Sequence, residues 1–219
     1  MKKIDRKKIA EKVAKILLEI NGITLNPKKP YRYTSGILGP VYTDCRLLMG
    51  HPKERKIIIG LLLNLIQSTD NYDVIAGTAT AGIPHAAWIS HKLNKPMVYV
   101  RGKAKDHGKG NQIEGILKKN QKVAVIEDLI STGESSVQTV RAIRNAGAKS
   151  SNIFSIITYK MKKSEDNFKQ NKVRLTSLTS FADVVSVAKK NKYIANEDQN
   201  ILLEFIKDPP TWGKRMGFE

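Results

Sequence analysis

Residues 123–136 combine side chains that suit the binding of a phosphorylated sugar. An apolar segment typical of a buried strand ends in two adjacent carboxylates, Glu127 and Asp128. Ser, Thr and Gly residues follow, and a helix is predicted over residues 134–146. Small residues before a helix let backbone N–H groups converge on a phosphate, whereas paired carboxylates accept hydrogen bonds from vicinal hydroxyls. These residue types therefore predict a site for ribose 5-phosphate.

The same residues resemble the signature of type I phosphoribosyltransferases for phosphoribosyl pyrophosphate (PRPP). That signature is an apolar strand, two acids, two apolar residues and then Ser/Thr-Thr/Ala-Gly. The resemblance implies that the two acids bind the ribose hydroxyls and that residues 131–135 hold the 5-phosphate. The PRPP-binding residues implied here are Glu127, Asp128, Leu129, Ile130, Ser131, Thr132, Gly133, Glu134 and Ser135. The alternative is that these acids and hydroxyls only cap the helix.

Residues 101–115 predict an exposed loop that closes over an anion. The loop holds four glycines and several cationic side chains, so it cannot pack a core. A solvated charged loop without a function is the alternative. Its pattern, Arg-x-x-x-Lys-x-His-Gly, resembles the catalytic loop of orotate phosphoribosyltransferases. The resemblance implies that Arg101, Lys105 and His107 are catalytic and contact the pyrophosphate of PRPP. It also implies a homodimer, in which the loop is shared between subunits.

A third segment, residues 77–85, follows a predicted strand and is rich in small residues that let the backbone approach an anion. The family resemblance assigns this turn to pyrophosphate, with Thr80 and Ala81 as the binding residues. A tight strand-to-helix turn without a ligand is the alternative. For His85 we expect a packing or capping role.

Residues 33–42 resemble the N-terminal hood that covers the base in this family. The resemblance implies that Tyr42 and Ser131 contact orotate. Tyr42 suits stacking on a flat pyrimidine, and the equally favoured alternative is that Tyr42 packs in the core. Some relatives have a lysine where this chain has Thr34, which leaves Lys160 as a candidate for the orotate carboxylate.

The elements around these residues alternate between helix and strand from residue 52 onward. Helices are expected over residues 52–67, 82–93, 134–146, 180–190 and 196–206, and strands over 72–76, 97–100, 122–126, 153–159 and 173–178. This pattern predicts an α/β fold, with a parallel sheet flanked by helices, as in type I phosphoribosyltransferases. We expect one domain over residues 1–219, in which residues 1–50 form an N-terminal helix and a small hood. Ligands of such sheets bind at the carboxyl ends of the strands.

Charge, hydropathy and cysteine content indicate the type of ligand and the cellular compartment. The formal net charge of +18 suits a polyanionic ligand or simply reflects solvated lysines. No apolar segment approaches the ~20 residues of a membrane span, and the basic N-terminus leads into no apolar signal segment. The single cysteine, Cys45, fits a reducing compartment. We therefore expect a cytoplasmic protein without a membrane partner.

Together, the resemblances imply transfer of ribose 5-phosphate from PRPP to orotate. The products would be orotidine 5'-phosphate and pyrophosphate, as in de novo pyrimidine (UMP) biosynthesis. Mg²⁺ is the expected cofactor, held through PRPP and water rather than by dedicated metal ligands. One alternative is a purine phosphoribosyltransferase. Another is a regulator of the same fold that binds RNA, although the catalytic-loop pattern makes a nucleic-acid partner the less favoured interpretation.

Overall fold

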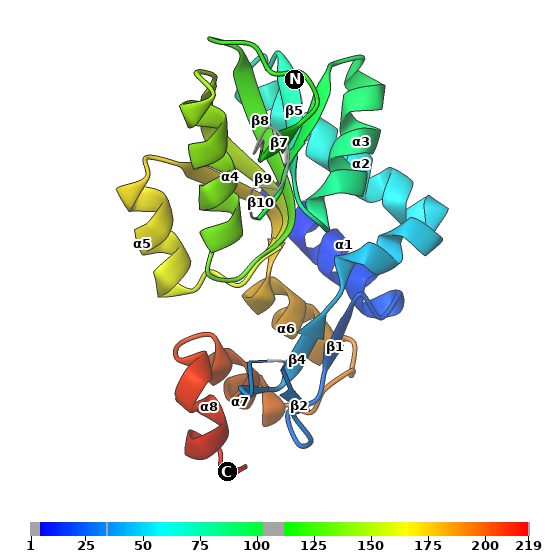
Figure 1. The fold of residues 1–219 in the computed structure, drawn as a ribbon. Helices are drawn as coiled ribbons and strands as arrows, with labels where there is room; N and C mark the ends of the chain where they lie inside the picture. The colour runs from blue at the N-terminus through cyan, green and yellow to red at the C-terminus, as the bar shows by residue number, and fades with distance from the viewer. Residues whose placement is uncertain (1–4, 34, 103–111, 219) are drawn as a thin grey trace.

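A computed structural model describes residues 5–33, 35–102 and 112–218. Its centre is a six-stranded sheet in the order β10-β9-β8-β5-β6-β7, in which only the β6–β7 pair is antiparallel (Figure 1). The strands are β5 (Val74–Thr78), β6 (Met97–Val100), β7 (Ile113–Glu114), β8 (Lys122–Ile130), β9 (Lys149–Thr158) and β10 (Arg174–Ser180). The predicted α/β fold with a parallel sheet is confirmed.

Helices cover both faces of this sheet. The helices α1 (Arg6–Glu19), α2 (Pro52–Thr69) and α3 (Gly82–Leu93) pack on one face, and α4 (Glu134–Asn145) and α5 (Lys162–Gln170) pack on the other. Successive strand residues alternate between the two cores, because side chains of a strand point to opposite faces. In β5, Ile75 joins the first core, whereas Val74 and Ala76 join the second.

A smaller lobe lies beyond the sheet, at the bottom of Figure 1. In it β1 (Ile23–Leu25) pairs with β4 (Val41–Thr43), and β2 (Tyr31–Arg32) pairs with β3 (Leu38–Gly39). The 3-10 helix η1 (Cys45–Gly50) then leads back to α2, while α6 (Phe181–Lys190) and α7 (Asp198–Phe205) lead from the sheet to α8 (Pro209–Arg215), which packs against β3. Segments from both ends of the chain therefore build the lobe that carries the predicted hood.

The tail of the chain is anchored in that lobe by Trp212. Its side chain is fully buried, and its indole N–H donates a hydrogen bond to the Ile201 carbonyl at 3.0 Å. The Phe205 ring lies edge-on to it, with centroids 5.9 Å apart. A buried tryptophan with a satisfied N–H contributes a large apolar area to a small core.

Two of the differences from the predicted elements lie beside the predicted ribose 5-phosphate site. The strand predicted over residues 122–126 is too short, because β8 stays paired with β9 as far as Ile130, which lies opposite Thr158. The acid pair therefore lies within the strand. Helix α5 was not predicted from the sequence, because its only buried residues are Ser164 and Phe168, too few to produce an apolar periodicity.

Candidate active site

The two phosphate-binding segments predicted from the sequence meet at one cavity. This cavity of about 240 Å³ lies at the carboxyl ends of β5 and β8. Its lining consists of Ala79, Thr80, Ala81, Glu127, Asp128, Leu129, Ile130, Ser131, Thr132, Gly133, Glu134, Ser135 and Ser136. The segments are brought together because β5 and β8 are parallel neighbours, so both end at the same edge of the sheet.

The two acids at this cavity differ in their surroundings. Glu127 is buried, and its carboxylate accepts hydrogen bonds from the Ser136 hydroxyl at 3.0 Å and from the Asp128 backbone N–H at 3.2 Å. Burial raises the pKa of the Glu127 carboxyl well above its usual range, and the neighbouring Asp128 raises it further. Asp128 is only partly buried. Of the pair, Asp128 therefore offers the more accessible carboxylate to a sugar hydroxyl.

Residues 131–135, here called the phosphate loop, lead directly into the N-terminus of α4. Gly133 adopts a left-handed conformation with φ of +73°, and no side chain of the described residues caps the helix there. The first N–H groups of α4 are therefore open to an anion, which also gains from the helix dipole. Ser131, Thr132 and Ser135, which all carry hydroxyl groups, line the same cavity.

The turn after β5 approaches β8 very closely. A Cβ added at Gly82 would lie 2.5 Å from the Ile126 carbonyl oxygen, so only glycine fits at this position. On its other side, the Ala79 N–H donates to the Val100 carbonyl at 2.9 Å. The turn is thus fixed between β8, which carries the acids, and β6, which leads into the predicted catalytic loop.

Arg101 closes the base of that loop. Its backbone N–H donates to the Gln112 carbonyl at 2.9 Å, and the Gln112 side-chain amide donates to the Arg101 carbonyl at 2.8 Å. Its guanidinium is 3.6 Å from the Glu114 carboxylate. The end of the predicted loop forms β7, whereas Lys105 and His107 lie outside the described residues, so their catalytic roles stay predictions.

The hood presents Tyr42 to solvent. This side chain is 47% exposed on β4 and lies beside Tyr31, with ring centroids 5.9 Å apart, so it is not a core residue. Its contact with orotate stays a prediction, as does that of Ser131, which lines the cavity. Thr34 lies outside the described residues.

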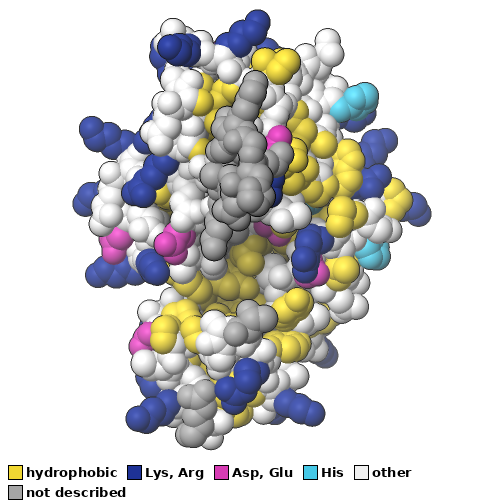
Figure 2. Space-filling view, viewed as in Figure 1, with side chains coloured by type: hydrophobic (Ala, Val, Ile, Leu, Met, Phe, Trp, Pro, Cys, Tyr) yellow, Lys and Arg dark blue, Asp and Glu magenta, His cyan; other side chains and the backbone are white. Residues whose placement is uncertain are grey.

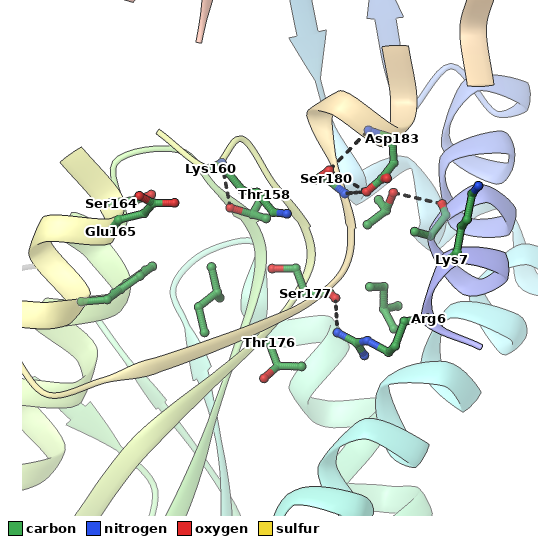
Figure 3. A pocket seen from close by; sticks show the side chains of 15 residues that line it. Arg6, Lys7, Thr158, Lys160, Ser164, Glu165, Thr176, Ser177, Ser180 and Asp183 are labelled. Atoms are coloured by element: carbon green, nitrogen blue, oxygen red, sulfur yellow. Dashed lines mark hydrogen bonds between the residues drawn. The ribbon is translucent and has the colours of Figure 1, made fainter. Parts of the chain in front are cut away.

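Lys160 lines a separate, larger cavity of about 610 Å³, which follows β10 between α1 and α5. Figure 3 shows Lys160 on the α5 side of this cavity, above Thr158, with Arg6 and Lys7 on the opposite side. The backbone N–H of Lys160 donates to the Thr158 hydroxyl at 3.1 Å. Lys160 is thus placed one strand away from the acid pair, since β9 adjoins β8.

His85 has the packing position expected for it. The side chain is fully buried and meets the Trp88 ring edge-on, with centroids 5.6 Å apart. Burial lowers the pKa of His85 to about 4, although the charge of Asp128 acts in the opposite direction. The imidazole is therefore neutral near pH 7.

The described residues contain neither a helix that could span a membrane nor a cluster of side chains that could hold a metal ion. Among the described residues, no helix combines the length and apolarity needed to cross a membrane, and no three His, Cys, Asp or Glu side chains converge to hold an ion. On the face shown in Figure 2, Lys and Arg side chains are spread around the outline rather than gathered into one stripe.

This fold and this site define a phosphoribosyltransferase domain. The model of the phosphoribosyl transferase domain family matches residues 48–190, which include β5, β8 and the phosphate loop. The orotate phosphoribosyltransferase of Listeria monocytogenes serotype 4b (strain F2365) is 49% identical to the chain, over 94% of this chain and 99% of the relative. The chain belongs to the orotate phosphoribosyltransferase family.

Further relatives support the same assignment. The orotate phosphoribosyltransferase of Enterococcus faecalis (strain ATCC 47077 / OG1RF) is 46% identical, over 94% of this chain and 99% of its own length. The crystal structure of orotate phosphoribosyltransferase from Aeropyrum pernix superimposes with a TM-score of 0.72 at 26% identity, over 84% of this chain and 99% of that one. The similarity thus extends well beyond the matched domain into the hood.

Proposed function

We propose that the protein transfers ribose 5-phosphate from PRPP to orotate and releases orotidine 5'-phosphate and pyrophosphate. The observation that carries this proposal is the single cavity shared by Asp128, the phosphate loop and the turn at Thr80. A sugar that bears both a 5-phosphate and a 1-pyrophosphate needs these three kinds of group side by side. The orotate phosphoribosyltransferase names of close relatives supply the identity of the base.

Each described group has a distinct task in this reaction. Asp128 accepts hydrogen bonds from the ribose hydroxyls. Glu127 accepts hydrogen bonds from the Ser136 hydroxyl and the Asp128 backbone N–H, and so holds Asp128 in position. The start of α4 holds the 5-phosphate, while the turn of Thr80 and Ala81 holds the pyrophosphate. This leaves the ribose C1 between the phosphate loop and the turn.

Cleavage of the bond between C1 and pyrophosphate places positive charge on the sugar and negative charge on the leaving group. Arg101, Lys105 and His107 are proposed to stabilise the leaving pyrophosphate. Closure of their loop would exclude water, which competes with orotate as the nucleophile. The ring nitrogen of orotate then attacks C1 directly, and no covalent enzyme intermediate forms.

Mg²⁺ is the proposed cofactor. The Asp128 carboxylate lines the cavity together with the turn of Thr80 and Ala81, and such an oxygen-lined cavity suits an ion that is held through PRPP and water rather than by dedicated metal ligands. When bound, it would neutralise part of the charge on pyrophosphate. A cytoplasmic location and a homodimer that shares the catalytic loop complete the proposal.

The direct test is spectroscopic. Enzyme, orotate and Mg²⁺ are mixed, PRPP is added, and the ultraviolet absorbance of the base is followed. A change that requires PRPP supports the proposal, and absence of any change contradicts it. Adenine, guanine and hypoxanthine in place of orotate test the purine alternative. Steeply salt-dependent RNA binding without turnover would instead favour a regulator.

A further inference from the structure

Helix α5 contacts the phosphate loop through two consecutive residues. The Asn167 side-chain amide donates a hydrogen bond to the Thr132 carbonyl at 2.9 Å. The next residue, Phe168, is 6% exposed, and its ring occupies the space beside Gly133, where an added Cβ would lie 2.6 Å from it. Asn167 and Phe168 thus connect α5 to the loop.

The hydrogen bond from Asn167 determines which way a backbone donor points. The peptide between Thr132 and Gly133 is planar and trans, so its C=O and N–H point in opposite directions. With the Thr132 carbonyl held toward α5, the Gly133 N–H points away from α5. Both residues line the cavity, and no residue of α5 does. The left-handed φ of Gly133 is the conformation found where successive N–H groups form an anion-binding nest.

Hydrogen bonds join Asn171, the residue that ends α5, to α4, the helix that follows the phosphate loop. Arg141 donates from Nε to the Asn171 side-chain oxygen at 2.8 Å, and Arg144 donates from Nη1 to the Asn171 carbonyl at 2.7 Å. The Asn171 side-chain amide in turn donates to the Asn167 carbonyl at 2.7 Å. These contacts fix the position of Asn167 relative to α4, so its hydrogen bond to the loop is held in one geometry.

We propose that Asn167 is a positioning residue for the 5-phosphate of PRPP, because it fixes the peptide that presents the Gly133 N–H to that phosphate. This inference rests on the proposed function, since the phosphate belongs to the PRPP assigned there. Without the bond, the Thr132–Gly133 peptide is free to rotate and to turn its carbonyl toward the phosphate. Asn167 itself acts through the loop and does not touch the ligand.

Two substitutions and one control test this role. In Asn167→Asp the side chain keeps its shape but loses the N–H donor, and in Asn167→Ala the donor is removed without adding charge. Lys163→Ala on the exposed side of α5 is the control. Calorimetry with ribose 5-phosphate should show an affinity at least about tenfold lower for Asn167→Ala, and lower still for Asn167→Asp. Affinity for pyrophosphate with Mg²⁺, which does not use the loop, should change less than twofold.

A spectroscopic signature separates positioning from packing. In protein labelled with ¹⁵N-glycine, the Gly133 amide resonance should shift when ribose 5-phosphate binds to the wild type, and this shift should shrink in Asn167→Ala. Unchanged affinity for ribose 5-phosphate in both variants would overturn the inference, as would an equal loss of affinity for pyrophosphate. If the wild type itself fails to bind ribose 5-phosphate, the proposed function falls together with the inference.

Discussion

Replacement of Gly82 by alanine tests the close approach on which the cavity depends. The added Cβ would lie 2.5 Å from the Ile126 carbonyl oxygen and 3.5 Å from the Glu127 Cα. A carbon and a carbonyl oxygen rest at about 3.3 Å, so the turn after β5 must retreat from β8 by roughly 0.8 Å. All of these atoms belong to the backbone of β8, which has little freedom to move.

The retreat would separate the pyrophosphate turn from the acid pair. A misplacement of about 1 Å at reacting groups costs on the order of 100-fold in rate, so kcat/KM with PRPP should fall roughly 10- to 100-fold in Gly82→Ala. Overpacking costs about 1–3 kcal/mol of unfolding free energy. The φ of Gly82 is not in the left-handed region, so the substitution carries no backbone strain that would blur this result.

Gly60→Ala is the matched control. Gly60 lies in the middle of α2, where an added Cβ meets nothing within 4 Å. Alanine should therefore stabilise the helix by about 0.5–1 kcal/mol and leave turnover unchanged. Steady-state kinetics and thermal unfolding of both variants provide the measurement. Wild-type activity and stability in Gly82→Ala would refute the argument, because the approach of the turn to β8 would then not exist.

Three further predictions concern the ionisable residues Lys105, Asp128 and His85. Lys105→Ala should lower kcat about 100- to 1,000-fold with no change in thermal unfolding, as expected for loss of a group that stabilises the leaving pyrophosphate; wild-type turnover would remove Lys105 from the chemistry. Asp128→Asn should weaken PRPP binding about 10- to 100-fold in calorimetry, and an unchanged Kd would contradict the ribose assignment. Because burial holds the pKa of His85 near 4, the unfolded chain binds more protons than the folded one between about pH 6.5 and 4. The free energy of unfolding should therefore fall as the pH is lowered across this window, by about 2.5 kcal/mol from this group. Urea unfolding of His85→Leu should show a flatter pH dependence, and an identical slope would argue against burial of a neutral imidazole.

Much of the site could be predicted from the sequence because its chemistry is carried by contiguous segments. An apolar strand, two acids, a Ser-Thr-Gly loop and a helix start occupy residues 123–136 without interruption. Local backbone geometry then suffices to form an anion site, since a helix N-terminus follows small residues directly. The alternation of strands and helices likewise depends on short-range periodicity, which predicts the parallel sheet.

Contacts between residues far apart in the sequence determine the features of the site and the hood that the sequence did not predict. The turn at Thr80 reaches the acid pair only because β5 inserts between β6 and β8 in the sheet. Asn167 reaches the phosphate loop because α5 folds back against α4, although 35 residues separate it from Thr132. The hood gains α8 through a buried Trp212 near the end of the chain. A sequence pattern reports periodicity along the chain, whereas these arrangements depend on which surfaces pack together once the chain is folded.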